Sequence, residues 1–219
     1  MATTATGTEQ ARPESVLALL PASKTTAYDK GHIIYGVDTC PRSIYLVISG
    51  TVGIMHGAED GSRLLLDIAR PNELFGESAF LAATRSDAAE ALERTELMSW
   101  GFSEMIDLVT ARPRLAMALL RAMAQRNAVY AGRIESLTND SIDRRLARAL
   151  LLLSQRVGTQ EDGGFVSMIP LTQRMLSQYI GTSREIISHH MNRFRRNGYV
   201  DYSRRAIRLH PDSLKSLLD

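Results

Sequence analysis

Residues 171–209 constrain the fold of this chain more than any other stretch, because their pattern is that of two short, separately capped helices followed by a hairpin. Thr172 is a suitable N-cap, since its hydroxyl can accept a hydrogen bond from a free backbone N–H at the helix start. The following helix has an apolar face formed by Met175, Leu176 and Ile180. Gly181 permits a left-handed turn at its end.

The second helix is expected to follow an N-cap at Thr182 or Ser183, and its apolar positions are Ile186, Ile187, Met191 and Phe194. Asn197-Gly198 then predicts a tight turn. Tyr199–Tyr202 with Ala206–Leu209 predicts a hairpin whose tip carries Arg204 and Arg205. The combination indicates a winged helix-turn-helix. The alternative is a generic helical hairpin with a solvated basic face, but caps, glycine, hairpin and charge all favour the winged motif.

The formal net charge of +2 hides an asymmetry along the chain. Residues 139–219 contain 13 Lys/Arg and 8 Asp/Glu, whereas residues 1–138 contain 13 and 16. The basic part is therefore the part with the predicted helix-turn-helix, as expected of a domain that binds the phosphate backbone of double-stranded DNA.

From Thr25 to about Phe102 the sequence consists of short apolar runs separated by turn residues. The strand candidates are Ile33–Tyr35, Ile44–Ile48, Val52–Met55, Leu64–Ile68 and Leu97–Trp100. Strands at this spacing predict a small sandwich or barrel. We expect a short helix at Pro13–Leu20 before the strands and another at Ser103–Thr110 after them. The fold class is therefore α+β.

A long helix is predicted from Pro113, which suits a first helical turn, to about residue 138. Leu119, Met123, Tyr130, Ile134 and Leu137 fall on one stripe at spacings of 4, 7, 4 and 3. A helix of this length exceeds what one small β domain can cover, so a partner helix across a two-fold axis is the natural cover. The alternative is a core helix packed only within its own chain.

Thr138-Asn139-Asp140 interrupts this pattern and is a candidate hinge, with Asp140 or Ser141 capping a further helix at Ile142–Val157. That helix has Leu146, Leu150 and Leu153 on its core face. Gly158–Gly164 is expected to be a polar loop and Phe165–Ile169 a strand. The expected organisation is a β domain at 1–112, a dimerisation helix at 113–138 and a winged helix domain at 139–219.

The cysteine content and the hydropathy limit the cellular setting. The single cysteine, Cys40, excludes an intrachain disulfide and a cysteine-held iron–sulfur cluster within one chain. No apolar run approaches the length that spans a bilayer, and no signal peptide is evident. We therefore expect a cytoplasmic protein that makes no membrane contact.

Two motifs carry a family resemblance: Gly181-Thr-Ser-Arg-Glu, and Phe75-Gly-Glu followed by Thr84-Arg-Ser. The chain resembles, over nearly its whole length, the bacterial superfamily of the cyclic-AMP receptor protein and the fumarate–nitrate reduction regulator. The resemblance implies a cyclic-nucleotide-binding-like β-roll, a dimer helix and a DNA-binding winged helix. Its implied function is a dimeric transcription regulator with a sensing or RNA polymerase-contacting N-terminal domain.

The second motif resembles the family's phosphate-binding cassette. Backbone N–H groups around Gly76 and Ser86 could hold an anionic phosphate, Arg85 could add a charge-assisted contact, and Glu77 could accept from a ribose hydroxyl. The alternative is that Gly76 is only a turn and that Glu77 is an exposed acid paired with Arg85. These residues are the candidate effector site.

Two departures from the family count against cyclic AMP itself. Asp87 stands where members that bind cyclic AMP usually have alanine, and a carboxylate near a phosphate costs affinity unless it is paired or turned away. Tyr130 and Ala131 align with a Thr-Ser pair that contacts adenine in the receptor. Another small anion, an altered nucleotide or no ligand are the other expectations. Haem would need an axial ligand such as His32, His56 or Cys40, each of which is more simply an ordinary surface residue.

DNA would be read from the start of the second helix. By the resemblance, Glu185 accepts from a cytosine amino group and Ser188 matches a serine of the fumarate–nitrate regulator. Arg184 can donate to guanine or phosphate, and His189 replaces an arginine, so a variant base preference is expected. Phosphate-contact candidates are Thr172, Gln173, Ser183, Arg204 and Arg205. A dimer would place two such helices about 34 Å apart, on a palindrome.

Two other classes of function fit the sequence less well. A sensor module that acts through protein interaction would not need a winged helix. An enzyme would need a Ser/His/Asp arrangement, a metal-spaced histidine cluster or a close pair of carboxylates, and none stands out in the sequence.

Overall fold

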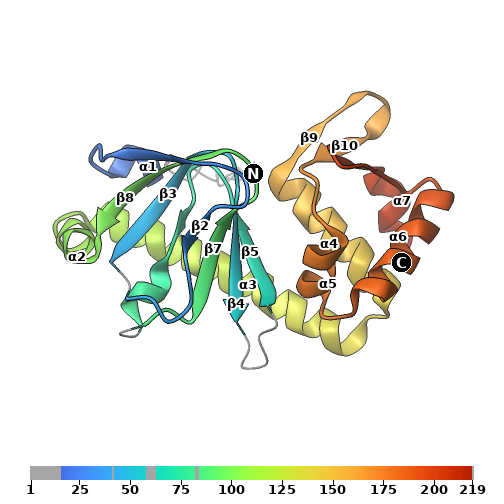
Figure 1. Cartoon of the computed structure of the whole chain (residues 1–219), viewed down its shortest axis with the longest axis horizontal. Coiled ribbons are helices and arrows are strands. Elements are labelled where there is room, and N and C mark those ends of the chain that lie inside the picture. Colours follow the sequence, from blue (N-terminus) through green and yellow to red (C-terminus); the bar gives the residue numbers. More distant parts are fainter. Residues whose placement is uncertain (1–15, 41, 58–62, 82–83, 219) are drawn as a thin grey trace, which may run out of the picture.

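The computed structural model describes residues 16–40, 42–57, 63–81 and 84–218. A β-rich N-terminal part and a mainly helical C-terminal part are joined by one long helix (Figure 1). Of the expected first helix, Val16–Leu19 forms α1, and residues 13–15 lie outside the described range. No helix in the described ranges is long and apolar enough to cross a membrane.

The N-terminal part is a roll of two four-stranded antiparallel sheets, with strand orders β1-β8-β3-β6 and β2-β7-β4-β5. The strands are β1 (Thr25–Tyr28), β2 (Ile33–Tyr35), β3 (Ser43–Ser49), β4 (Val52–Gly57), β5 (Arg63–Ala69), β6 (Leu74–Phe75), β7 (Asp87–Ala91) and β8 (Thr95–Gly101). A short 3-10 helix, η1 (Glu77–Phe80), follows β6. Buried side chains from both sheets, including Val47, Val52, Phe75 and Leu97, fill the space between them.

All five expected strands of the roll are confirmed, but the sequence reasoning missed three others. Strand β7 reads DAAEA, and alanine and acidic residues are poor strand formers in isolation. Its pairing with both β2 and β4 overrides that preference. Strand β1 carries little apolar character, and β6 has only two residues. In the C-terminal part, β9 (Gly158–Gln160) pairs with β10 (Val166–Met168), so the expected polar loop there is in part a strand.

Helices α2 (Phe102–Ala111) and α3 (Pro113–Asn139) follow the roll, and Pro113 lies in the first turn of α3 as expected. The expected apolar stripe of α3 is wrong in part. Leu119 packs against a buried cluster that includes Trp100 of β8 and Leu115 of α3. Met123 and Tyr130 are half-buried. The exposed row is Met117, Leu120, Ala124, Asn127, Ala131, Ile134 and Thr138, at alternating spacings of three and four. The sequence pattern was ambiguous because α3 is apolar on two faces.

The C-terminal part comprises α4 (Ile142–Val157), η2 (Asp162–Gly164), α5 (Gln173–Ile180), α6 (Arg184–Arg196), α7 (Pro211–Lys215), and a sheet of order β11-β12-β10-β9, with β11 at Val200–Tyr202 and β12 at Ile207–Leu209. The expected caps are confirmed. Ser141, Thr172 and Ser183 each accept a hydrogen bond from a backbone N–H of the first helical turn. Gly181 ends α5 with φ 74°, a left-handed conformation that favours glycine.

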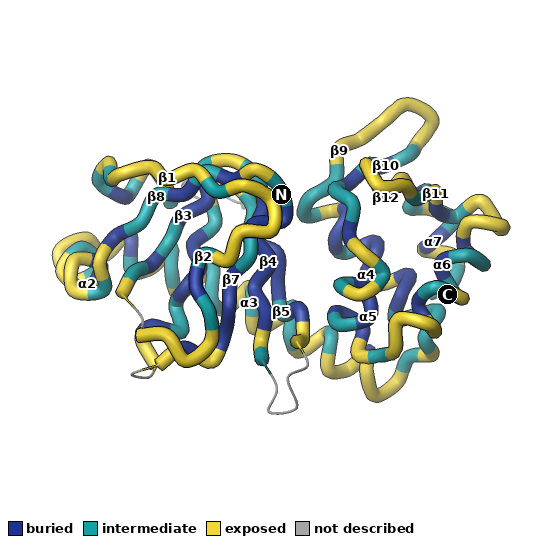
Figure 2. Tube along the Cα trace, viewed as in Figure 1, coloured by how far each residue is buried: buried dark blue, intermediate teal, exposed yellow. Residues whose placement is uncertain are grey.

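The two parts share an apolar contact region. Met55, Leu65, Ile68 and Leu92 of the roll belong to the same buried cluster as the core of the C-terminal part, which includes Leu146, Leu150 and Phe194. Figure 2 shows the buried backbone concentrated in the strands of the roll and on the inner sides of α4 and α5. The helix-turn-helix is therefore packed against the roll through burial of apolar surface.

Candidate nucleic-acid interface and sensor cassette

Helix α6 has one buried and one exposed face. Ile187, Met191 and Phe194 are each at most 1% exposed and anchor it in the domain core. The sequence analysis placed Ile186 on the same face. It is 41% exposed, because adjacent residues of a helix point about 100° apart and Ile187 occupies the buried face. Arg184, Glu185 and His189 are exposed and Ser188 is half-exposed, so all four lie on the side of α6 that solvent can reach.

Glu185 lies in the first turn of α6, directly after the cap at Ser183. A hydrogen bond from its own backbone N–H, and then one from the Ser183 side chain, hold the pKa of the Glu185 carboxyl below its usual value. The group is therefore ionised at neutral pH. An ionised carboxylate only accepts hydrogen bonds, which suits a cytosine amino group and not a guanine edge.

The two adjacent histidines of α6 have different surroundings. His190 Nδ1 lies 2.5 Å from Asp143 Oδ1 of α4, and Asp143 also forms an ion pair with Arg193. His190 is thereby part of the packing between α4 and α6. His189 is exposed, and its ring lies edge-on to that of His190 with the ring centres 5.4 Å apart.

The wing is joined to α6 by contacts that the sequence did not predict. The Tyr202 hydroxyl donates to Asn192 Oδ1 at 2.9 Å, and the Arg195 guanidinium lies 5.2 Å from the centre of the Tyr202 ring. Asn192 and Arg195 continue the solvent-facing side of α6 at helical spacing from Glu185 and His189. That spacing was the signal that could have found them.

The phosphate-contact candidates surround this side of α6. Thr172 and Ser183 are exposed caps, at the starts of α5 and α6, and Gln173 is the first residue of α5. Arg204 and Arg205 are exposed between β11 and β12, at the expected wing tip. Helix N-termini and exposed arginines both attract phosphate oxygens.

In the sensor cassette, Arg85 lies beside Gly76 and contacts the chain itself. Gly76 has φ 87°, a left-handed conformation, and starts η1. Arg85 is only 2% exposed. Its guanidinium donates to Gly76 O at 3.0 Å, to Ser78 Oγ at 3.0 Å and to Ser43 O at 2.7 Å. It also lies 3.8 Å from the centre of the Tyr35 ring. These donors are thus engaged by the chain itself.

Asp87, the departure noted in the sequence, is paired inside the roll. It accepts from the Tyr35 hydroxyl at 2.9 Å and from Ser78 Oγ at 2.5 Å. Burial first, and the Asp87 charge second, raise the pKa of Tyr35 well above its usual value, so the hydroxyl stays a donor. Tyr35, Tyr45 and Phe75 stack on one another with ring centres 5.2 to 6.3 Å apart. Ser86, between Arg85 and Asp87, is exposed.

Glu77 pairs with Arg126 of α3, and not with Arg85 as the alternative interpretation held. Arg126 also lies near Asp67 of β5, with Nε 3.2 Å from Asp67 Oδ2, and donates to Leu74 O at 2.9 Å. Burial lowers the pKa of Arg126, but Glu77 and Asp67 outweigh it and raise the pKa above its usual value. Burial, and then Asp67, raise the pKa of Tyr130 to about 12.

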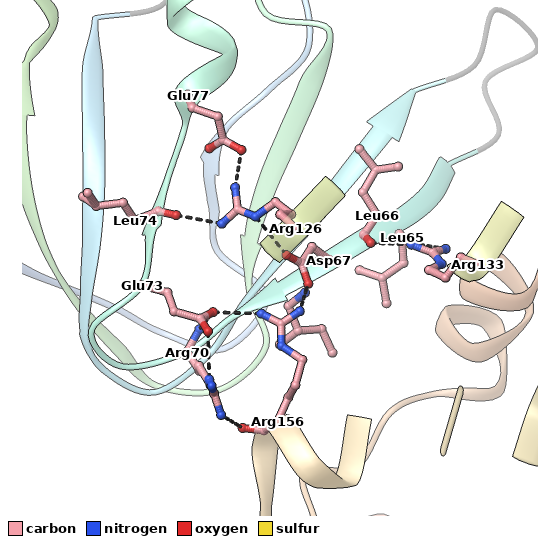
Figure 3. A network of polar contacts seen from close by, with 11 residues as sticks. Leu65, Leu66, Asp67, Arg70, Glu73, Leu74, Glu77, Arg126, Arg133 and Arg156 are labelled. Atoms are coloured by element: carbon pink, nitrogen blue, oxygen red, sulfur yellow. Dashed lines mark hydrogen bonds and ion pairs between the residues drawn. The ribbon is translucent and has the colours of Figure 1, made fainter. Parts of the chain in front are cut away.

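These contacts extend from the cassette to the C-terminal part (Figure 3). Asp67, which is 4% exposed, lies between Arg126 of α3 and Arg156 of α4 and pairs with both. Arg156 Nη2 also lies 2.9 Å from Glu73 Oε2, and Glu73 pairs with Arg70. We call Asp67, Glu73, Glu77, Arg126 and Arg156 the inter-domain ion cluster.

Arg133 makes a second connection between the parts. The β4–β5 ladder shifts register so that Ile54 faces Asp67 and Met55 faces Leu65, which leaves Leu66 as a bulge. Arg133 of α3 donates to the carbonyls of Leu65 and Leu66. It also donates to Tyr179 O of α5 at 2.7 Å and lies 3.9 Å from the centre of the Tyr179 ring.

The two remaining effector candidates, Tyr130 and Ala131, are adjacent in α3 but differ in burial. Tyr130 is half-buried beside Asp67, whereas Ala131 belongs to the exposed row of α3. Among the described residues, no group of three or more His, Cys, Asp or Glu is arranged to hold a metal ion. Cys40 is an exposed free cysteine.

A β-roll with a phosphate-cassette motif, a long connecting helix and a winged helix-turn-helix together define the class: two-domain DNA-binding transcription regulators. Models of the cyclic nucleotide-binding domain and the Crp-like helix-turn-helix domain match residues 25–112 and 144–217. The chain is 30% identical over 189 residues to the CRP-like cAMP-activated global transcriptional regulator of Mycobacterium tuberculosis, covering 86% of this chain and 84% of that protein. The chain belongs to the CRP/FNR family of transcription regulators.

Solved structures agree with this assignment. The crystal structure of a CRP/FNR-family transcriptional regulator from Thermus thermophilus is 28% identical, with a TM-score of 0.70 over 89% of this chain and 97% of that chain. FixK2 from Bradyrhizobium japonicum has a TM-score of 0.77 over 90% of this chain and 98% of its own, at 22% identity, and shows the shared fold.

Proposed function

We propose that two copies of this chain form a dimer that reads a palindromic DNA site through the exposed side of α6. One observation carries the proposal: Arg184, Glu185, Ser188 and His189 share the solvent-facing side of a helix whose other side is locked into the domain core. Glu185 would accept from a cytosine, and Arg184 would donate to a guanine or a phosphate. Thr172, Gln173, Ser183, Arg204 and Arg205 would contact phosphates and set the register.

The dimer is supported by the exposed row of α3. Leu120 and Ile134 of this row are 62% and 65% exposed, so a single chain leaves their apolar surface in water. The row repeats at alternating intervals of three and four, the spacing of a coiled-coil seam. A second copy of α3 packed along this row would bury it and would relate the two DNA-binding domains by a two-fold axis.

The sensor domain would either bind an effector at the cassette residues Gly76, Glu77, Arg85 and Ser86, with Tyr130 and Ala131 nearby in the dimer, or contact RNA polymerase. The internal contacts of Arg85 and Asp87 support an effector other than cyclic AMP, or none. The protein would act in the cytoplasm as a regulator and not as an enzyme.

The test is a base-by-base binding profile. Each base pair of a bound palindrome is substituted in turn, and affinities are measured for the wild type, Glu185→Ala and Asp212→Ala. Asp212 is an exposed acid outside the recognition helix. We expect Glu185→Ala to reduce discrimination at one G·C pair per half-site by about tenfold or more, and Asp212→Ala to leave the profile unchanged. A profile for Glu185→Ala identical to the wild type at every position would contradict the assignment.

A further inference from the structure

A cavity of about 680 Å³ lies outside the cassette, between the β5–β6 segment, α1, α3 and the end of α4. Its lining includes neither Arg85 nor Ser86, nor any residue of the exposed row of α3. Its size falls within the range of small-molecule sites. Because Arg156 and Leu152 of α4 line it together with Asp67 and Glu73 of the roll, both domains contribute to it.

The lining is strongly cationic. Five arginines line the cavity, against the carboxylates of Asp67 and Glu73: Arg70, Arg114, Arg121, Arg126 and Arg156. Even when Glu77 is counted, which pairs with Arg126 from outside the lining, cations exceed anions by two. Such an excess in a recess concentrates the positive potential and attracts anions.

The two carboxylates are already shared. Asp67 accepts from the Ile68 backbone N–H and pairs with two arginines. Glu73 pairs with Arg70 and Arg156. Each guanidinium offers five N–H donors, so Arg70 and Arg156 retain donors beyond those used in these contacts. Arg121 is exposed on α3 and makes no hydrogen bond or ion pair within the described ranges.

The lining also contains apolar side chains. Leu74, Leu119, Val129 and Leu152 contribute to it, together with Val16 and Leu19 of α1. Guanidinium groups bind phosphate oxygens in a two-pronged manner, and apolar side chains accept a flat ring. We propose that this cavity is a second ligand site, which binds a nucleoside diphosphate through Arg121 and its neighbouring arginines and packs the base against the apolar side chains of the lining.

Occupancy of this site would reach the DNA-binding domain directly. Phosphates that contact Arg156 would compete with Asp67 and Glu73 for its donors, and those two acids are what attach Arg156 to the roll. The ligand would therefore alter the inter-domain ion cluster without entering the cassette.

The test is calorimetric titration of the full chain with ADP, AMP and inorganic pyrophosphate at constant ionic strength. The variants are Arg121→Ala and, as a matched control, Arg94→Ala, which removes an exposed arginine of the roll outside the cavity. We expect saturable ADP binding, weaker binding of AMP, and about a tenfold loss of ADP affinity in Arg121→Ala but not in Arg94→Ala, as for one charge-assisted contact. Weaker binding of pyrophosphate than of ADP would support a contact between the base and the apolar side chains of the cavity.

Three results would overturn the proposal. In the first, neither ADP nor pyrophosphate binds saturably. The second is equal ADP affinity for Arg121→Ala and Arg94→Ala. The third concerns Arg204→Ala at the wing tip: a larger loss there than in Arg121→Ala would place the nucleotide on the DNA-binding surface. Because these readouts do not use DNA, they are independent of the palindrome proposal.

Discussion

The Arg85 guanidinium lies inside the sensor domain, where Gly76 O, Ser43 O and Ser78 Oγ surround it. The Thr84-Arg-Ser sequence matches the family's cassette, yet the side chain acts here as a packing and hydrogen-bonding centre. Its neighbour Asp87 is fixed by Tyr35 and Ser78 and is 8% exposed. An anionic ligand at Arg85 would have to reach a guanidinium that is 2% exposed and approach a buried carboxylate.

From this arrangement we predict that cyclic AMP does not sharpen DNA binding. Fluorescence anisotropy with a labelled palindrome, with and without cyclic AMP, should give DNA affinities within about twofold of each other. A nucleotide that does not occupy the cassette cannot shift the DNA-binding equilibrium. A tenfold or larger increase in DNA affinity would show that the cassette opens for the nucleotide despite Asp87.

At the scale of elements, the sequence predicted most helices and their caps but only part of the roll. The caps at Thr172 and Ser183 and the turn at Gly181 could be predicted because each depends on local backbone chemistry. Strand β7 could not, because only its pairing with β2 and β4 makes DAAEA a strand. Long-range ion pairs such as Asp67–Arg156 left no local signal at all.

The exposed row of α3 leads to a prediction about assembly. Leu120→Asp should produce a monomer at micromolar concentration, because a carboxylate opposite its symmetry mate would be buried without a partner. Sedimentation velocity measures the change. Asp107→Ala, an exposed site on α2, is the control and should remain a dimer. A Leu120→Asp variant that sediments as a dimer would contradict the assignment of this row to the interface.

The inter-domain ion cluster leads to a prediction about stability. Asp67→Ala removes the carboxylate shared by Arg126 and Arg156, whose side chains are 13% and 17% exposed, and leaves two largely buried charges underpaired. We expect a loss of about 3–5 kcal/mol in the free energy of unfolding, measured by urea denaturation, because breaking one side of a buried pair is costly. Asp107→Ala should change it by less than about 0.5 kcal/mol. A loss below about 1 kcal/mol for Asp67→Ala would mean that the cluster does not hold the domains together.

At the scale of the whole molecule, the parts joined by α3 differ in charge and in fold. Residues 139–219 carry the excess of basic residues and the α6 surface, whereas residues 1–138 carry a net negative charge and the roll. The net negative charge of residues 1–138 disfavours contact between this part and DNA phosphates. The contacts of Asp67 and Arg133 with both parts provide a physical route by which a change in the roll could alter the position of α6.

The most direct test of the account is selection of preferred DNA from a random pool with the full-length chain. We predict two inverted half-sites with centres about 10 base pairs apart, or about 34 Å, each containing one strongly preferred G·C pair. An asymmetric single half-site, a direct repeat or no enriched sequence would contradict the central claim that a symmetric pair of α6 helices reads DNA.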